Sequence, residues 1–153
     1  MIAAIDVRVQ RERFDVAAEL ARLEALGGGA VASFTGIVRG GDGLVELMLE
    51  HHPAMTVAML TDIAGEAARR WPLLGVTLIH RVGGLAPGEP IVLTATASPH
   101  RAAALESCAF LIDWAKTRAP FWKRERFADG ASRWVEAREA DDAAAARWGD
   151  AAR

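Results

Sequence analysis

Short runs of hydrophobic residues, separated by turns rich in glycine and proline, predict seven β-strands along the chain. The run GVTLIHRV alternates between hydrophobic and polar positions, as a strand with one buried face does. Gly36 interrupts another run and indicates a β-bulge or a close backbone approach. Asp129-Gly130 separates the last two runs and is a strong hairpin signal. The predicted strands are residues 2–9, at a sheet edge, 30–39, 44–52, 75–82, 91–98, 121–127 and 132–137.

Hydrophobic residues at helical spacing predict three helices between these strands. Asp15 can cap the first helix with its side chain, and Gly27 can end it. Ser98 and Pro99 are typical of a helix start, because the hydroxyl can accept from an unpaired backbone N–H and proline fits the first helical position. The predicted helices are residues 15–26, 53–71 and 98–118.

The order of these elements predicts an α+β fold. Strands and helices are mixed along the chain, and several neighbouring strands are joined by short turns, so a largely antiparallel sheet is expected. No repeat and no linker divides the chain. Its last 17 residues include eight alanines and are expected to form a loosely held helix or tail.

Composition and charge exclude several classes of protein. Of the 153 residues, 52% are hydrophobic and 25% are charged, which excludes a disordered or collagen-like chain. The formal net charge of −2 makes nucleic acid an unexpected partner. No hydrophobic run reaches the roughly 18 residues that span a membrane, and the early charges of the N-terminal sequence differ from a signal peptide. We therefore expect a cytoplasmic protein without a membrane or nucleic-acid partner.

Two lysines occur beside 16 arginines, and they lie seven positions apart at Lys116 and Lys123. Arginine is therefore the usual cation of this chain. A lysine amine, unlike a guanidinium, can lose its proton near neutral pH or act as a nucleophile. The two lysines are candidate catalytic residues; the alternative is that they are two ordinary solvated side chains.

The predicted helix start at Ser98 is a candidate anion site. His100 and Arg101 would lie in the first helical turn, beside unpaired backbone amides at the positive end of the helix dipole. Amides, dipole, imidazole and guanidinium together would hold a phosphate or a carboxylate. The alternative is that Arg101 pairs with a nearby acid while His100 only packs.

The segment around this helix is basic. Residues 98–126 hold six lysines or arginines against three acids, a net charge of +3 that suits a small anionic substrate or an acidic partner. Arg39, at the end of a predicted strand, is a further cation that such a site could use. For Arg39 and for the basic segment alike, the alternative is an ordinary solvated surface.

The sequence contains no motif for a metal or a cofactor. His51 and His52 are neighbours on a predicted strand and point to opposite faces, so they cannot jointly chelate one ion. His80 is expected to be a structural strand residue. The single cysteine, Cys108, lies among hydrophobic residues of a predicted helix, where a buried inert thiol is expected rather than a nucleophile.

Five sequence motifs occur in the order found in the catalytic subunit of molybdopterin synthase, and the chain resembles this family over residues 2–137. The motifs are FTGIVR (34–39), LEHHPAM (49–55), HRVGGLAPGE (80–89), SPHR (98–101) and KTRAPFWKRERFADGASRWVEA (116–137). The block from Ser98 to Val135 is the most specific. The resemblance implies a catalytic-subunit domain in residues 1–137 and leaves residues 138–153 as an alanine-rich tail.

The resemblance implies a fold, a reaction and a set of partners. The family fold is an α/β hammerhead with an additional antiparallel β-sheet subdomain. The implied reaction, in molybdenum cofactor biosynthesis, converts cyclic pyranopterin monophosphate to molybdopterin by adding two dithiolene sulfurs. A small ubiquitin-like carrier subunit donates each sulfur from the thiocarboxylate of its C-terminal Gly-Gly. Two carriers assemble with a homodimer of the catalytic subunit into a heterotetramer, and no cofactor or metal is implied.

Residue by residue, the resemblance places both lysines in the active site. Lys116 would hold the carrier's terminal carbonyl group and stabilise the charge that develops there, whereas Lys123 would orient the pterin precursor and transfer protons. The implied substrate-binding positions are Phe34, Arg39, Met55, His100, Arg101 and Arg133. His51-His52-Pro53 stands where relatives commonly carry an acidic or aromatic residue after Leu-Glu, so the pocket rim is expected to differ.

Two other functions fit parts of the sequence. Cys108 could carry a persulfide as the nucleophile of a different enzyme class, in which case Cys108→Ala would abolish turnover. The chain could also be a non-catalytic subunit that only docks a ubiquitin-like partner, in which case Lys116→Ala and Lys123→Ala would leave the cellular output unchanged. The presence of both lysines, Arg39 and the His100-Arg101 pair favours the sulfurtransferase, because a subunit that only docks a partner would be free to lose them.

Overall fold

Two four-stranded sheets and four helices make up the part of the chain that this computed structural model describes, residues 2–135 and 139–149. The main sheet contains, in spatial order, β1 (Ala4–Gln10), β4 (Gly75–Arg81), β6 (Pro90–Ser98) and β2 (Ala30–Ile37). The arm sheet contains β5 (Gly83–Leu85), β3 (Leu44–His51), β7 (Phe121–Phe127) and β8 (Ser132–Trp134). The helices are α1 (Val16–Glu24), α2 (Pro53–Arg70), α3 (Arg101–Arg118) and α4 (Glu139–Ala146), and none of them is long and apolar enough to cross a membrane.

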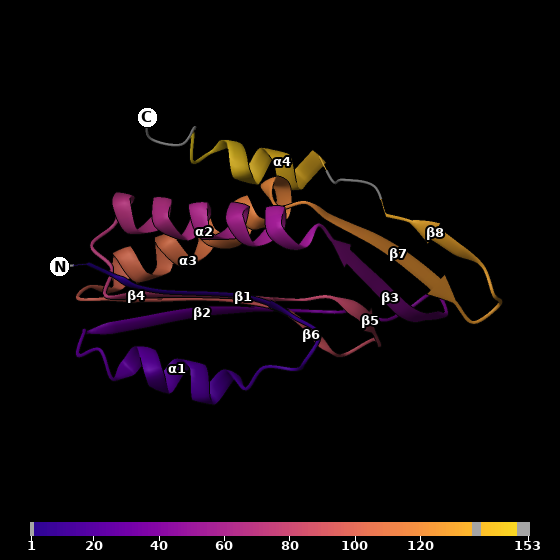
Figure 1. Ribbon diagram of the computed structural model, residues 1–153, viewed down its shortest axis with the longest axis horizontal. Coiled ribbons are helices and arrows are strands. Elements are labelled where there is room, and N and C mark those ends of the chain that lie inside the picture. Colours follow the sequence, from indigo (N-terminus) through magenta and orange to yellow (C-terminus); the bar gives the residue numbers. More distant parts are fainter. Residues whose placement is uncertain (1, 136–138, 150–153) are drawn as a thin grey trace.

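Helices cover both faces of the main sheet, with α2 and α3 on one face and α1 on the other (Figure 1). The central strands are therefore shielded on both sides, and every residue of β4 is buried. The largest hydrophobic cluster lies between this sheet and the two long helices and includes Leu60, Leu78, Phe110 and Leu111. Because burying a side chain of this size contributes roughly 1.5–3 kcal/mol, this core holds α3 firmly against the sheet.

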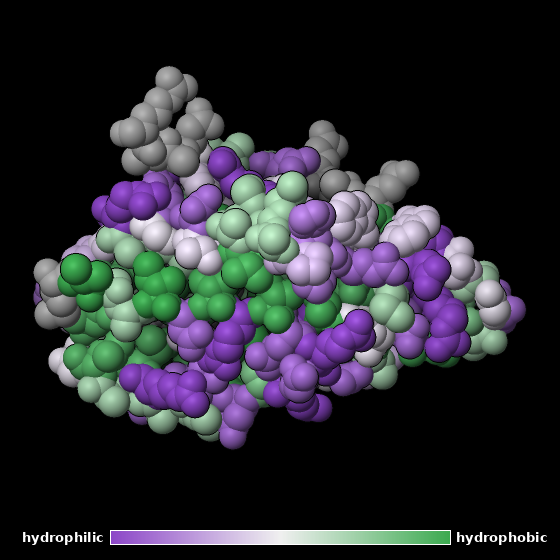
Figure 2. Space-filling model, viewed as in Figure 1, coloured by the Kyte–Doolittle hydropathy of each residue, from purple (hydrophilic) through white to green (hydrophobic). Residues whose placement is uncertain are grey.

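The arm sheet extends beyond the helices at one end of the main sheet (Figure 1). A single residue, Val82, separates β4 from β5, so the chain passes directly from one sheet into the other. Val82 is buried, and Val38, Leu49 and Leu85 form a small hydrophobic cluster of their own in this region. Figure 2 shows a mixture of hydrophilic, near-neutral and hydrophobic side chains over the outer part of the arm. No residue of β7 is buried and all of β8 is exposed, so the arm has little core beyond its base.

The sequence predicts most of these elements, and the α+β fold is confirmed. Among the strand pairs of the described residues, the one between β1 and β4 is parallel and the others are antiparallel, and β1 lies at a sheet edge as predicted. A register shift between Gly36 and Ile37 confirms the bulge in β2. The Asp15 side chain accepts from the N–H of Ala18 at 3.1 Å, which confirms the helix cap. The hairpin between β7 and β8 forms at the predicted turn.

The start of α3 differs from the prediction. Ser98 is the last residue of β6; its hydroxyl donates to the carbonyl oxygen of Pro72 at 2.9 Å and accepts from the N–H of His100 at 3.3 Å, ahead of the helix. His100 occupies the N-cap position without a capping side-chain hydrogen bond, and Arg101 is the first helical residue. The predicted helix start, with Ser98 as the cap and Pro99 as the first helical residue, is therefore wrong by two residues.

Two segments are more ordered than the sequence predicts. The strand β5 lies in a predicted loop; it has three residues, two of them glycines, and so no hydrophobic alternation. The C-terminal segment is not loosely held over residues 139–149, because Ala145 is buried and the Trp148 ring lies 5.6 Å from the Trp71 ring, centre to centre. The indole N–H of Trp148 also donates to the Asp113 carboxylate at 2.8 Å. The predicted end of the last strand and the predicted domain boundary, both at residue 137, lie outside the described residues.

Candidate active site

A cavity of about 700 Å³ lies where the end of α3, the arm sheet, the β2–β3 connection and the start of α4 meet. Both lysines of the chain, Lys116 and Lys123, line this cavity together with Arg39 and Arg133. The structure therefore brings four of the predicted site residues into one place. Basic side chains in a cleft attract small anions to the extent that neighbouring acids do not offset their charge.

Two elements that meet at a sharp turn position the lysines. Lys116 lies in the last turn of α3, where a cation interacts favourably with the negative end of the helix dipole. Pro120 prevents the helix from continuing, because proline lacks an N–H and clashes with the preceding turn. Lys123 is the third residue of β7, and its half-buried side chain shares a strand face with Phe121 and Glu125.

Arg39 reaches the cavity from the connection between the main sheet and the arm sheet. It lies two residues after β2, and the residues that follow it, Gly40 to Asp42, also line the cavity. Gly41 and Gly43 have φ angles of 119° and 75°, which glycine adopts without the steric cost of a side chain. These glycines allow the tight turn that places Arg39 at the junction of the sheets.

The cavity is not purely basic. Carboxylates of Asp42, Glu125, Asp141 and Asp142 also line it, the last two contributed by α4. Arg133 Nε donates to Glu125 Oε1 at 3.1 Å, and the two side chains form an ion pair. Arg133 therefore contributes less positive charge to the cavity than its position suggests.

Behind the cavity wall, the Phe121 ring stacks on His80 of β4, with ring centres 3.8 Å apart and planes inclined by 20°. Burial lowers the pKa of His80 to about 4; the hydrogen bond to Arg81 opposes this shift, and the charges of both lysines add to it. In that hydrogen bond His80 Nδ1 lies 2.8 Å from the carbonyl oxygen of Arg81. The imidazole is therefore neutral at neutral pH, and the prediction that His80 is a structural strand residue is confirmed.

Four predicted site residues lie away from this cavity in the same chain. Arg101 begins α3 and Lys116 lies near its end, about 22 Å away along the helix axis. His100 precedes Arg101 at the same helix start. Phe34 on β2 and Met55 in the first turn of α2 are 39% and 53% exposed and do not line the cavity. The substrate contacts of these four residues stay predictions.

Cys108 is buried in α3 and does not line the cavity. Burial raises the pKa of its thiol, and a hydrogen bond with Thr94 opposes that shift. A protonated, inaccessible thiol is a poor nucleophile. Within the residues that the structure describes, no three His, Cys, Asp or Glu side chains lie close enough together to hold a metal ion.

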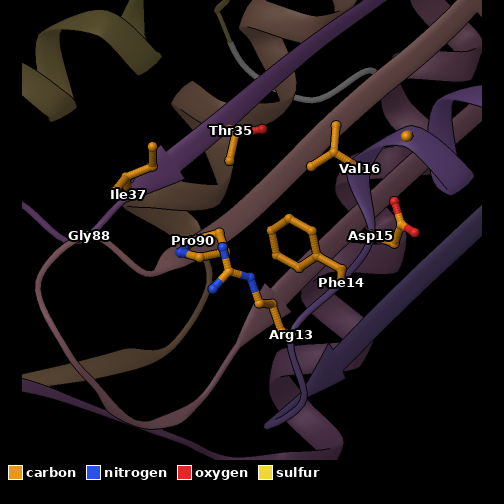
Figure 3. A pocket seen from close by; sticks show the side chains of 9 residues that line it. Arg13, Phe14, Asp15, Val16, Thr35, Ile37, Gly88 and Pro90 are labelled. Carbon is orange, nitrogen blue, oxygen red and sulfur yellow. The ribbon is translucent and has the colours of Figure 1, made fainter.

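A second cavity, of about 650 Å³, lies beside the start of α1 and is open to solvent (Figure 3). Figure 3 shows the Phe14 ring among its lining residues and Arg13 extending toward Pro90. The one carboxylate that lines this cavity, that of Asp15, already caps α1. With one arginine and mostly hydrophobic walls, this cavity offers less chemistry than the one that contains the lysines.

Several residues of the lysine cavity were not found by the sequence analysis. Glu125 follows Lys123 at a spacing of two on a predicted strand, and this period could have identified it. Asp141 and Asp142 reach the cavity because α4 packs back against α3. No local sequence pattern signals such an approach, because it depends on how the whole chain folds.

The chain is similar to proteins of one family over most of its length. The sequence model of the family described as MoaE protein matches residues 9–118. A molybdopterin synthase catalytic subunit of Mesorhizobium japonicum is 52% identical over 151 residues, which cover 96% of this chain and 95% of that protein. A molybdopterin synthase catalytic subunit of Pseudomonas aeruginosa is 51% identical over 147 residues, which cover 93% of this chain and 97% of that protein.

Solved structures of such proteins are also similar to this chain over most of its length. Molybdopterin cofactor biosynthesis protein E from Burkholderia multivorans is 49% identical, with a TM-score of 0.82 over 99% of this chain and 100% of that chain. A molybdopterin synthase structure from Staphylococcus aureus is 30% identical, with a TM-score of 0.74 over 84% of this chain and 95% of that chain. The match to the Burkholderia multivorans structure covers the elements that line the lysine cavity.

Proposed function

The chain belongs to the MoaE protein family, and from this premise we propose that its lysine cavity transfers sulfur in the synthesis of molybdopterin. Relatives that share about half of its residues are molybdopterin synthase catalytic subunits, and the chain is accordingly an enzyme of molybdenum cofactor biosynthesis. The finer proposal concerns the substrates. Cyclic pyranopterin monophosphate accepts two dithiolene sulfurs, and a small ubiquitin-like carrier subunit donates them from its C-terminal thiocarboxylate.

One observation carries the proposal: the two lysines of the whole sequence line the same cavity. A thiocarboxylate and a cyclic phosphate are both anions, and both need cationic partners in a partly desolvated site. Lys116 would hold the carrier's terminal carbonyl group and stabilise charge that develops on it. Lys123 would orient the pterin precursor and transfer protons as sulfur adds. Arg39 would hold the phosphate or the anionic terminus.

The proposal also assigns partners to the chain. A cavity of about 700 Å³ has the size of a small-molecule site, and a Gly-Gly tail is the narrowest peptide that could enter it from the carrier. His100 and Arg101 lie about 22 Å from Lys116 within one chain, so a second copy must bring its own α3 start to the cavity if they are to contact the substrate. A homodimer with one carrier on each copy meets both requirements.

The test is an in vitro reaction of the purified chain, thiocarboxylated carrier and cyclic pyranopterin monophosphate, with molybdopterin read as its fluorescent oxidation product. We expect Lys116→Ala and Lys123→Ala each to lower turnover about 100-fold or more, the usual effect of removing a group that stabilises developing charge. Arg22→Ala is the matched control, because Arg22 is an exposed cation of α1 outside the cavity. No product from the wild type with a competent carrier would contradict the proposal.

Cys108→Ala separates this proposal from a persulfide enzyme. The buried thiol, with its raised pKa, is unsuited to carry sulfur, so we expect the variant to keep nearly full activity. Loss of turnover in Cys108→Ala, with both lysine variants active, would favour the persulfide enzyme instead. Lysine variants that assemble with the carrier and still sustain cofactor synthesis in cells would indicate a subunit that only docks its partner.

A further inference from the structure

The two-residue link between α3 and β7, Ala119 and Pro120, determines how the two lysines lie relative to each other. Lys116 precedes the link in the last turn of α3, and Lys123 follows it as the third residue of β7. Within the link, the N–H of Phe121 donates to the carbonyl oxygen of Ala119 at 3.0 Å. So short a link transmits any shift of its backbone directly to both lysine-bearing elements (Figure 1).

A buried hydroxyl from α2 holds this link. Thr56 is 0% exposed, and its Oγ1 donates to the carbonyl oxygen of Pro120 at 3.1 Å. A helical threonine often donates to the carbonyl of its own preceding turn, and Thr61 of the same helix does so, to Val57 at 2.7 Å. Thr56 instead donates across 64 positions of sequence, so its hydroxyl joins α2 to the link.

A buried ring from β4 contacts the first residue after the link. The His80 imidazole stacks on Phe121, the first residue of β7, and the bond from Nδ1 to the Arg81 carbonyl fixes the orientation of the imidazole. Lys123 and Lys116 place positive charge near this ring, which stays neutral because it is buried. His80 therefore supports the cavity wall without adding a charge that would repel the lysines.

We propose that Thr56 and His80 are positioning residues that clamp the α3–β7 link and thereby set the relative placement of the Lys116 and Lys123 amino groups. Neither side chain lines the cavity, so both act through the link and not on the substrate. The clamp itself follows from the contacts of the link. Its consequence for turnover rests on the proposed function.

The experiment compares two isosteric variants of buried threonines. Thr56→Val removes the hydroxyl that holds the link, whereas Thr96→Val removes an equally buried hydroxyl that donates to the Ala104 carbonyl oxygen at 2.8 Å, in the first turn of α3 and far from the link. Both should lower thermal stability to a similar extent. Thr56→Ser, which keeps the hydroxyl, is the rescue variant.

The lysines themselves supply a readout that needs no substrate. A chain grown with isotope-labelled lysine gives two lysine side-chain signals by NMR, one for each lysine of the sequence. We expect Thr56→Val to shift both signals and Thr96→Val to leave them in place. In the sulfur-transfer reaction we expect Thr56→Val to lower kcat about tenfold with KM little changed, because a misplacement of about 1 Å can cost up to about 100-fold. Thr56→Ser should restore both readouts.

His80 provides a second, independent pair of variants. His80→Phe keeps a neutral ring on Phe121, so the lysine signals should stay close to those of the wild type, whereas His80→Leu should shift them. Lysine signals that are unchanged in Thr56→Val and His80→Leu, or equally shifted in Thr96→Val, would overturn the clamp. Absence of turnover in the wild type would instead contradict the proposed function, and the NMR comparison would still decide for or against the clamp.

Discussion

Arginine substitutions at the two lysines separate positive charge from proton transfer. Arginine keeps the charge but does not release its proton near neutral pH. If Lys123 transfers protons and Lys116 stabilises charge, Lys123→Arg should lower kcat as strongly as Lys123→Ala, while Lys116→Arg should keep about a tenth of the turnover or more. Measured kcat and KM values of the four variants test this division of roles, and equal losses in both arginine variants would contradict it.

Buried His80 should make the stability of the fold depend on pH. Its pKa is lowered from 6.5 to about 4, so the unfolded chain binds a proton more readily than the native chain between these values. The free energy of unfolding should therefore fall, by on the order of 3 kcal/mol, as the pH is lowered through this window. Above the window, the stability contributed by neutral His80 should be fully present. Urea titrations at pH 7 and pH 4 measure the change. In His80→Phe, which has no titratable ring, the fall should be smaller; an equal fall would exclude His80 as its cause.

At the scale of elements, an aromatic side chain that follows α4, Trp148, contributes to the attachment of this helix. Trp148 packs on Trp71 and Phe110, and both Trp148 and Arg147 donate to Asp113. Trp148→Ala should lower the free energy of unfolding by about 2 kcal/mol, less than for a fully buried tryptophan because the ring is half-buried. Arg147→Ala removes an exposed ion pair and should cost less than about 1 kcal/mol. Chemical denaturation of both variants tests this order, and equal effects would contradict it.

The elements show which parts of a fold a sequence can predict. Elements defined by local periodicity or by a local cap, such as β4 and the Asp15 start of α1, form where the sequence predicts them. The start of α3 lies two residues later than predicted; the Ser98 hydroxyl accepts from the N–H of His100 and donates to Pro72, a partner that no local pattern reveals. The strand β5 depends on its pairing with β3, with Leu47 and Leu85 in register, because three residues, two of them glycines, have little strand preference of their own.

The candidate site, like the fold, can be predicted from the sequence only in part. Scarcity of lysine identifies Lys116 and Lys123 without any knowledge of the fold, and the strand-end position identifies Arg39. Thr56 and His80 carry no such signal, because their partners Pro120 and Phe121 are distant in the sequence and the contacts exist only after the helices and sheets have packed. Rare residue types are therefore visible in a sequence, whereas the side chains that orient them are not.

At the scale of the whole molecule, the length of α3 predicts how two copies share a site. Arg101 and Lys116 lie about 22 Å apart on one rigid helix, so Arg101 of one copy should act on the cavity of the other. Arg101→Ala and Lys123→Ala should each be nearly inactive alone. In a mixed dimer of the two variants, one cavity carries both defects and the other carries none, because the site is shared across a two-fold axis.

An equal mixture of these two variants, unfolded and refolded together, should therefore recover about a quarter of wild-type activity, because half of the dimers are mixed and each has one intact site. Dimers of each variant refolded separately and then combined without exchange are the control and should stay inactive. If Arg101 acted within its own chain, every cavity of a mixed dimer would carry one defect. Recovery would then be absent, and the requirement for a second copy at the site would be wrong.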